Sequence, residues 1–164
     1  MKKQIKSFKS AFKGFCSAVK SESHMRFHLV ATFYVFAFGC FYDFSAEKWA
    51  LLAVLCSFVI VLELVNTCVE RLCDLLCDRY DFSVKIIKDI AAAAVLAVSF
   101  SAVFTAVLFF LNFEVIGKIF LYFANNPVML GLLILSAVIS AVFVCAGPVK
   151  VKNAILSIKR KDKH

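Results

Sequence analysis

Long apolar runs and short polar links alternate along this chain. Four runs approach or reach the length of about 20 residues that a helix needs to cross a bilayer. They cover roughly residues 28–44, 49 to beyond 63, 90–113 and 127–148. The first run is short and has polar flanks, whereas the third and fourth carry no charge. The pattern predicts an all-α integral membrane protein with three transmembrane helices and a fourth, C-terminal span.

The segment before the first run has a different periodicity. Its large apolar residues recur at steps of three and four: Ile5, Phe8, Phe12, Phe15 and Val19. At about 100° per residue they fall in one sector of a helix, with lysines on a neighbouring flank. This pattern predicts an amphipathic helix on the membrane surface. The apolar stretch IFLYFA between the third and fourth runs likewise indicates an interfacial segment rather than a free loop.

Composition supports the membrane assignment. The chain has 164 residues, 62% of them hydrophobic, with a mean hydropathy of +0.87. So small a domain exposes much of its surface, so the apolar excess must face lipid. Its seven cysteines form no CxxC pair and lie mostly in apolar runs, which favours packing over zinc binding.

Basic residues predict the orientation. Seven lysines and arginines precede the first run, and one, four, one and six follow in the successive links and the tail. By the positive-inside rule this alternation places both termini in the cytoplasm. We interpret the net charge of +8 as a result of the membrane topology and as a source of attraction to anionic lipids. We expect no nucleic-acid partner.

The end of the second run carries polar residues on one side. Within ELVNTCVERLCD, the side chains of Glu63, Asn66, Glu70 and Asp74 fall in a sector of about 80° on a helical wheel. An ionisable residue at membrane depth costs about 2.5–3.5 kcal/mol and normally faces a bundle interior or an aqueous cavity. Protrusion of this helix end into water would account for Asp74 but not for Glu63.

Such a face could perform phosphoryl transfer. Carboxylates bind magnesium, which arrives with nucleotide phosphates, and a neighbouring carboxylate can act as general base. Lys88 and Asp89, at the start of the third run, supply a positive group near the same boundary. No GxxxxGK[ST] loop occurs in the chain, so a Walker-type nucleotide site is excluded. Farther upstream, the four-residue spacing of Glu22 and Arg26 predicts an exposed ion pair.

The segments ESHMRFH, ELVNTCVERLCD and KDIAAAAVL together resemble the prokaryotic diacylglycerol kinase and undecaprenol kinase family. The resemblance covers residues 5 to about 112. It implies a lipid kinase domain over residues 1–114, followed over residues 115–164 by an extra transmembrane helix and a basic cytoplasmic tail. It also implies a homotrimer in the bacterial cytoplasmic membrane, with ATP and Mg2+ as cofactors and active sites shared between subunits.

The resemblance assigns roles to individual residues. It implies that Glu63 is the base that deprotonates the lipid hydroxyl and that Asn66 orients the site. Glu22 and Glu70 would hold magnesium, and Lys88 would neutralise the transferring phosphoryl group. Nucleotide binding would fall to the remaining acidic residues, Asp74, Asp81 and Asp89.

The chain departs from the family pattern at His24, Asp81 and Ile87, and these departures concern the nucleotide pocket. Undecaprenol and diacylglycerol both remain candidate acceptors, although ESHMRFH and KDIAAAAV favour undecaprenol. The alternative from another class is a degenerate family member that acts without catalysis, as a membrane partner protein. A cation transporter fits less well, because the later runs offer no matching charge.

Overall fold

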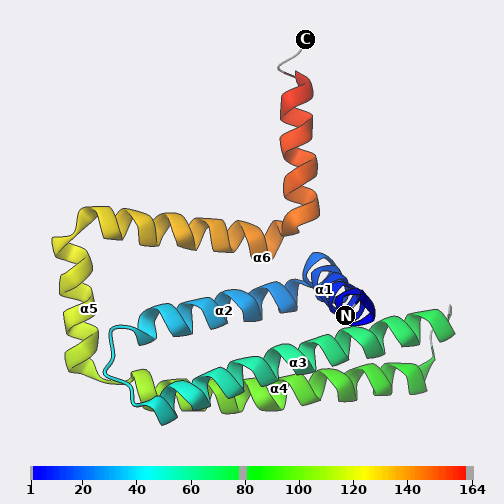
Figure 1. Ribbon diagram of the computed structural model, residues 1–164, viewed down its shortest axis with the longest axis horizontal. Helices are drawn as coiled ribbons and strands as arrows, with labels where there is room; N and C mark the ends of the chain where they lie inside the picture. Colours follow the sequence, from blue (N-terminus) through cyan, green and yellow to red (C-terminus); the bar gives the residue numbers. More distant parts are fainter. Residues whose placement is uncertain (1, 78–80, 162–164) are drawn as a thin grey trace.

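The computed structural model describes residues 2–77 and 81–161, with side chains described for residues 3–77 and 81–147. These residues form helices joined by short links and contain no strand, which confirms the all-α prediction. The helices are α1 (Lys2–Ser21), α2 (Ser23–Gly39), α3 (Ala46–Leu76), α4 (Phe82–Phe110), α5 (Phe113–Asn125) and α6 (Pro127–Lys161). Figure 1 shows α2, α3, α4 and the first part of α6 running lengthwise, whereas α1, α5 and the end of α6 run crosswise.

Three of the described helices are long and apolar enough to cross a membrane. They are α3, α4 and the part of α6 from Pro127 to Gly147. The fourth helix of the bundle, α2, has 17 residues, which corresponds to about 26 Å at 1.5 Å per residue. This is slightly less than the thickness of a hydrocarbon core of about 30 Å.

The predicted first span, residues 28–44, differs from α2 at both ends. The helix begins earlier, at Ser23, and stops at Gly39. The aromatic residues after Gly39 fold into a turn in which Phe44 stacks on Tyr42 and meets the Trp49 ring edge to face. Gly39 itself lies against the Trp49 ring, because a Cβ at this position would come within 2.6 Å of Cη2. The prediction was wrong here because hydropathy cannot separate an aromatic turn from a helix.

Helix α3 runs without a break from Ala46 to Leu76, so the apolar run and the polar face belong to one helix, as predicted. The polar link predicted over residues 76–89 is much shorter in the structure, because α4 already begins at Phe82. The Asp81 carboxylate caps α4 by accepting hydrogen bonds from the backbone N–H groups of Ser83 and Val84. Residues 78–80 of the predicted link lie outside the described part.

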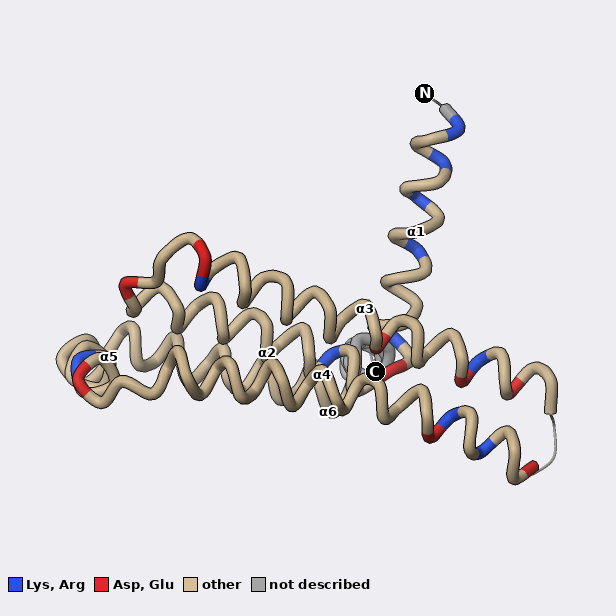
Figure 2. The backbone as a smooth tube through the Cα atoms, turned by 90° about the horizontal axis from the view of Figure 1, so that it is seen from below, with Lys and Arg blue, Asp and Glu red and all other residues tan. Residues whose placement is uncertain are grey.

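Charged residues of the described chain gather toward the ends of the bundle and leave a bare apolar stretch between them (Figure 2). We call the end formed by residues 63–76 of α3 and 82–89 of α4 the polar end. A slab of lipid around the bare stretch would leave both charged ends near its boundaries, as expected for membrane spans.

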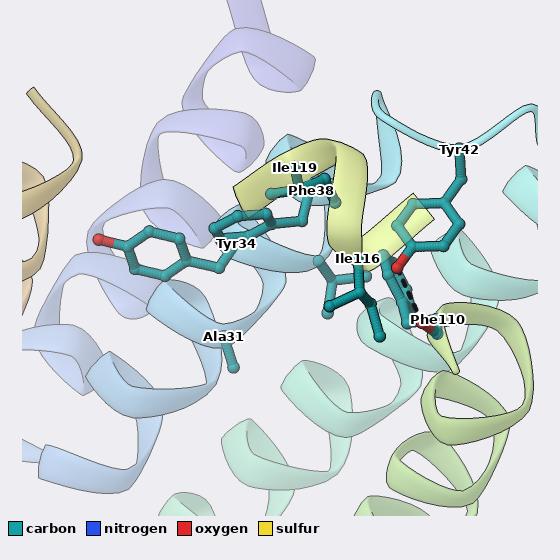
Figure 3. Close-up of a pocket in the computed structure, with 8 residues that line it drawn as sticks. Ala31, Tyr34, Phe38, Tyr42, Phe110, Ile116 and Ile119 are labelled. Carbon is teal, nitrogen blue, oxygen red and sulfur yellow. Dashed lines mark hydrogen bonds between the residues drawn. The ribbon is translucent and has the colours of Figure 1, made fainter. Parts of the chain in front are cut away.

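At the opposite end, α5 is a helix rather than a free loop, as its apolar pattern predicted. The Asn112 side chain caps it by accepting from the N–H groups of Glu114 and Val115. An apolar pocket of about 440 Å³ lies between α5, α2 and the end of α4. In Figure 3 the Tyr42 hydroxyl closes one side of this pocket by donating to the carbonyl of Phe110, at 2.8 Å.

The helix α6 contains the predicted fourth span and continues into the predicted basic tail. Gly147 interrupts it with φ 67° and ψ 160°. After this kink the helix turns aside from the bundle and continues to Lys161 (Figure 1). Residues 162–164 of the tail lie outside the described part.

Candidate active site

A cavity of about 580 Å³ opens between α2, α3 and α4, beside the polar end. Four residues of the predicted site line it: Glu63, Asn66, Glu70 and Asp89. The rest of the wall comes from residues that the sequence analysis did not assign to the site: His24, Phe27, His28, Ala92, Ala93, Val95, Leu96 and Ser99. The structure therefore gathers residues from three helices into one partly polar cavity.

The α3 wall of the cavity contains a buried polar group of side chains. Glu63 is 4% exposed and Asn66 is 8% exposed, which is rare for such residues without a functional or pairing reason. The Asn66 side-chain amide donates to Oε1 of Glu70 at 2.9 Å, so it fixes that carboxylate. Its own Oδ1 is buried and has no hydrogen-bond partner among the described residues. A buried acceptor without a partner is costly, so this oxygen is suited to a ligand in the cavity.

Lys88 lies on the first turns of α4 and reaches across to α3. Its ammonium group donates to the carboxylate of Asp74, and the two form an ion pair. The charge of Glu70 also acts on Lys88, so the lysine lies near the acidic face of α3. Lys88 is therefore paired with Asp74 near the acidic face of α3, although neither Lys88 nor Asp74 lines the cavity itself.

Glu22 occupies the junction between α1 and α2, where the backbone is extended and the chain changes direction. Its backbone N–H donates to the carbonyl of Ala18 at 2.8 Å. Glu22 does not line the cavity, but it lies near enough to interact electrostatically with Glu63, as do His24 and Glu70. From α3, the guanidinium of Arg71 donates to Oγ of Ser21 at 2.6 Å and holds this junction against the polar end.

The predicted ion pair between Glu22 and Arg26 was wrong. Arg26 is buried, with 5% of its surface exposed, and its side chain donates to backbone carbonyls instead. A spacing of four residues brings two side chains together only within one continuous helix. Here α2 begins at Ser23, so Glu22 lies outside the helix that carries Arg26.

Asp81, predicted to bind nucleotide, lies at the tip of the polar end as the cap of α4. One of its oxygens is occupied by the two backbone N–H groups it accepts from. It does not line the cavity. The cap explains Asp81 locally without a ligand, because a carboxylate at a helix N-terminus is stabilising.

An apolar cleft of about 210 Å³ adjoins the cavity, and the two share Phe27, His28 and Ser99. The remaining cleft wall is apolar apart from Thr32, with Leu52, Val59 and Val103 among its residues. The Ser99 hydroxyl is buried without a hydrogen-bond partner in the part of the chain that the structure describes. Polar and apolar spaces therefore meet at Ser99, which is an arrangement suited to a molecule with a polar head and a long apolar chain.

The residues that the sequence analysis missed carry weak signals. His24 and His28 are spaced by one helical turn and so lie on one face of their helix. Two histidines alone do not indicate that this face packs toward α3. Ala92 and Ala93 were noticed only as part of an alanine-rich segment. Their small side chains leave room for the cavity beside Glu63, which only the packing of α4 on α3 reveals.

The donors in the cavity fit magnesium chemically. Glu63, Glu70 and Asp89 offer carboxylate oxygens and Asn66 offers a buried amide oxygen without a partner, all of which are hard ligands. Among the described residues, however, no three His, Cys, Asp or Glu side chains are close enough to hold a metal ion by themselves. Magnesium is often held by only one or two carboxylates, supplemented by substrate phosphates and water.

An all-helical membrane protein with a buried carboxylate, Glu63, beside an apolar cleft has the features of an enzyme that acts on a membrane lipid. The family model described as prokaryotic diacylglycerol kinase matches residues 9–110, and the chain belongs to this family. A similar protein is the undecaprenol kinase of Bacillus subtilis (strain 168), with 33% identity over 91 residues. That match covers 56% of this chain and 74% of the relative. No solved structure matches the chain. Family and relative together indicate a lipid kinase.

The family match confirms the resemblance seen in the sequence, and it ends where α4 ends, at Phe110. The helices α5 and α6 therefore lie beyond the matched region. The division into two domains near residue 114 stays a prediction.

Proposed function

We propose that this protein transfers the γ-phosphoryl group of ATP to the hydroxyl group of a membrane lipid alcohol. The observation that carries the proposal is the cavity in which Glu63, Asn66, Glu70 and Asp89 meet beside an apolar cleft. A lipid in the cleft would present its hydroxyl to the cavity, and a nucleotide could approach from the polar end. The relative named undecaprenol kinase and the segments ESHMRFH and KDIAAAAV favour undecaprenol over diacylglycerol.

In this proposal Glu63 is the general base. It lies deepest in the polar face of α3, nearest the apolar cleft, and accepts the proton of the lipid hydroxyl as the phosphoryl group is transferred. Asn66 orients Glu70 through their hydrogen bond. Lys88 exchanges its bond to Asp74 for the charge of the transferring phosphoryl group. Asp74 and Asp89 border the nucleotide, and Asp81 supports it indirectly by fixing the start of α4.

Magnesium, when bound with ATP, would neutralise phosphate charge and align the phosphates for in-line transfer. Glu70 and Glu22 are the residues we assign to hold it. Glu70 faces the cavity, and Glu22 is positioned at the adjoining helix junction, close enough for its charge to act on Glu63.

We propose further that the active protein is a homotrimer in the bacterial cytoplasmic membrane, with its active sites at the cytoplasmic side. The basic residues around α1 and the polar end support this orientation. The outward face of α4 is apolar and exposed along its length, with Phe100, Phe104 and Leu108 each more than half exposed. In an oligomer, such a face would pack against another copy and close the open side of the cavity.

The test is a comparison of acceptors with purified full-length protein, magnesium and radiolabelled ATP. We expect label to enter undecaprenol at a higher kcat/KM than diacylglycerol. A preference for diacylglycerol would overturn the acceptor assignment, and absence of label from both lipids would favour the non-enzymatic partner protein.

A further inference from the structure

Arg26 is a buried cation that has no carboxylate partner among the described side chains. It is 5% exposed. The ion pairs of the described residues are Lys88 with Asp74 and Lys118 with Glu114, so Arg26 takes part in neither. A buried charge is costly unless it is paired or fully hydrogen-bonded. Its compensation must therefore come from other groups.

Those groups are the carbonyl ends of two helices. The Arg26 guanidinium donates through Nη1 to the carbonyls of Val19 and Lys20, at 3.0 and 3.3 Å, in the last turn of α1. Through Nε and Nη2 it donates to the carbonyl of Val144, at 3.2 and 3.1 Å, just before the kink of α6. Carbonyls in a last helical turn lack partners within the helix and carry partial negative charge. One guanidinium thus caps the ends of two helices, although Val144 lies 118 residues from Arg26 in the chain.

Gly147 makes this contact possible in two ways. Its φ of 67° is a conformation that side chains other than glycine rarely adopt. A Cβ at this position would also lie 3.1 Å from Cζ of Arg26 and 3.3 Å from both terminal nitrogens. The kink in α6 and the position of the guanidinium therefore depend on the same residue.

The hydrogen bonds of Arg26 to α1 lie next to Glu22, a residue of the candidate active site. The carbonyls of Val19 and Lys20 precede Glu22 by three and two residues, and Arg71 holds the other side of this junction through Ser21. A second link between α2 and α6 lies deeper in the bundle, where the Tyr34 hydroxyl is 2.9 Å from Oγ of Ser136. The span α6 lies beyond the residues that match the family.

We infer that Arg26 is a positioning residue that ties the C-terminal span α6 to the junction of α1 and α2 and thereby fixes Glu22 for magnesium. The assignment of Glu22 rests on the proposed function, whereas the tie itself rests on the contacts alone. In this protein the extra span α6 then supports the active site. The carbonyl of Val144, near its kink, helps hold the Arg26 side chain, and Arg26 in turn holds the junction of α1 and α2.

The first test measures hydrogen–deuterium exchange of backbone amides in the full-length protein without nucleotide. The variants are Arg26→Gln, which removes the guanidinium, and Gly147→Ala, which leaves Arg26 in place but fills its space. The matched control is Gly131→Ala in the same span, where a Cβ would meet nothing within 4 Å. Each lost charge-assisted hydrogen bond corresponds to roughly a tenfold change in an opening equilibrium. Because Arg26 makes several such bonds, we expect amides of residues 19–26 to exchange at least about tenfold faster in both variants and at the wild-type rate in the control. Unchanged exchange in both variants would overturn the tie.

The second test measures the magnesium concentration for half-maximal phosphorylation. Loss of a residue that supports a metal ligand typically weakens metal affinity by about 10-fold to 100-fold. We expect this range for Arg26→Gln and a smaller change in kcat, with Gly131→Ala unchanged. Faster exchange together with unchanged magnesium dependence would overturn the positioning role. If the wild-type protein phosphorylates no lipid, the proposed function fails, and the exchange experiment still decides whether the tie exists.

Discussion

Helices α3 and α4 are alike in sequence statistics and different in the structure. They have 31 and 29 residues, and their most apolar segments have the same mean hydropathy of 2.3. Yet 28% of that segment is buried in α3 and only 6% in α4. The buried residues of α3 include Glu63, Asn66 and Thr67, whereas Val95 alone is buried in α4.

The difference shows that hydropathy identifies a membrane helix but not its place in the bundle. Polar residues at membrane depth face the interior of the protein, away from lipid. The helix that carries them therefore lies at the centre of the helix bundle. A helix without them can face lipid or another copy of the chain. By this reasoning α3 supplies the buried chemistry and α4 supplies charge only at its polar end, through Lys88 and Asp89. The four predictions below test this division.

The largest effect should follow from Glu63→Gln. The amide keeps the size of the side chain but cannot accept the proton of the lipid hydroxyl. General base catalysis contributes about 10²-fold to 10⁴-fold, so we expect kcat to fall by that factor while ATP binding is retained. Initial rates and nucleotide binding, measured on the same preparation, check this. A rate equal to that of the wild type would contradict the assignment of the base.

Next in size should be Lys88→Gln on α4. Removing a positive donor that stabilises the transition state costs about 10²-fold to 10³-fold. The matched change is Asp74→Asn, which removes the partner of Lys88 and leaves the ammonium group in place. We expect a much smaller loss for Asp74→Asn than for Lys88→Gln. Equal losses in kcat would indicate that the ion pair itself, rather than the lysine, is what the reaction needs.

A smaller effect is expected for Glu70→Gln. This change preserves a partner for the Asn66 amide but weakens the ligand for magnesium. We expect the magnesium concentration for half-maximal rate to rise by about 10-fold to 100-fold. A magnesium titration at saturating ATP measures this. An unchanged titration curve, with the rate lowered at every magnesium concentration, would remove Glu70 from the metal site.

The smallest effect compares two threonines with the same local bond. Thr67 on α3 and Thr105 on α4 each donate to the carbonyl four residues earlier, at 2.9 Å. Side-chain hydrogen bonds in membrane proteins contribute about 0.6 kcal/mol on average. We expect Thr67→Val, at the buried position, to lower the free energy of unfolding by about this amount and Thr105→Val to be neutral. Equal losses at both positions would contradict the different burial of the two helices.

Much of this fold could be predicted because membrane helices follow from simple physics. The apolar runs predicted α3, α4 and the span in α6, and the helical wheel placed Glu63, Asn66 and Glu70 on one face, where the structure has them lining one cavity. The end of α2 could not be predicted, because the turn after Gly39 is stabilised by aromatic contacts made with α3.

The hydrogen bonds of Arg26 could not be predicted from the sequence for a related reason. Its partners are backbone carbonyls, which every residue has, so no side-chain pattern signals them. The nearest visible candidate was Glu22, and the sequence analysis chose it wrongly. The proline that follows Gly147 indicates in the sequence that the helix is interrupted there. Only the packing of α6 on α2 shows that the kink makes room for the Arg26 side chain.

The most direct measurement is transfer of labelled phosphate from ATP into lipid by the purified wild-type protein, with magnesium and with a chelator in its place. We predict one labelled lipid alcohol in the presence of magnesium, none with the chelator, and loss of that label in Glu63→Gln. Label that persists without divalent metal or with Glu63→Gln at the wild-type rate would contradict the claim that the polar face of α3 performs the reaction.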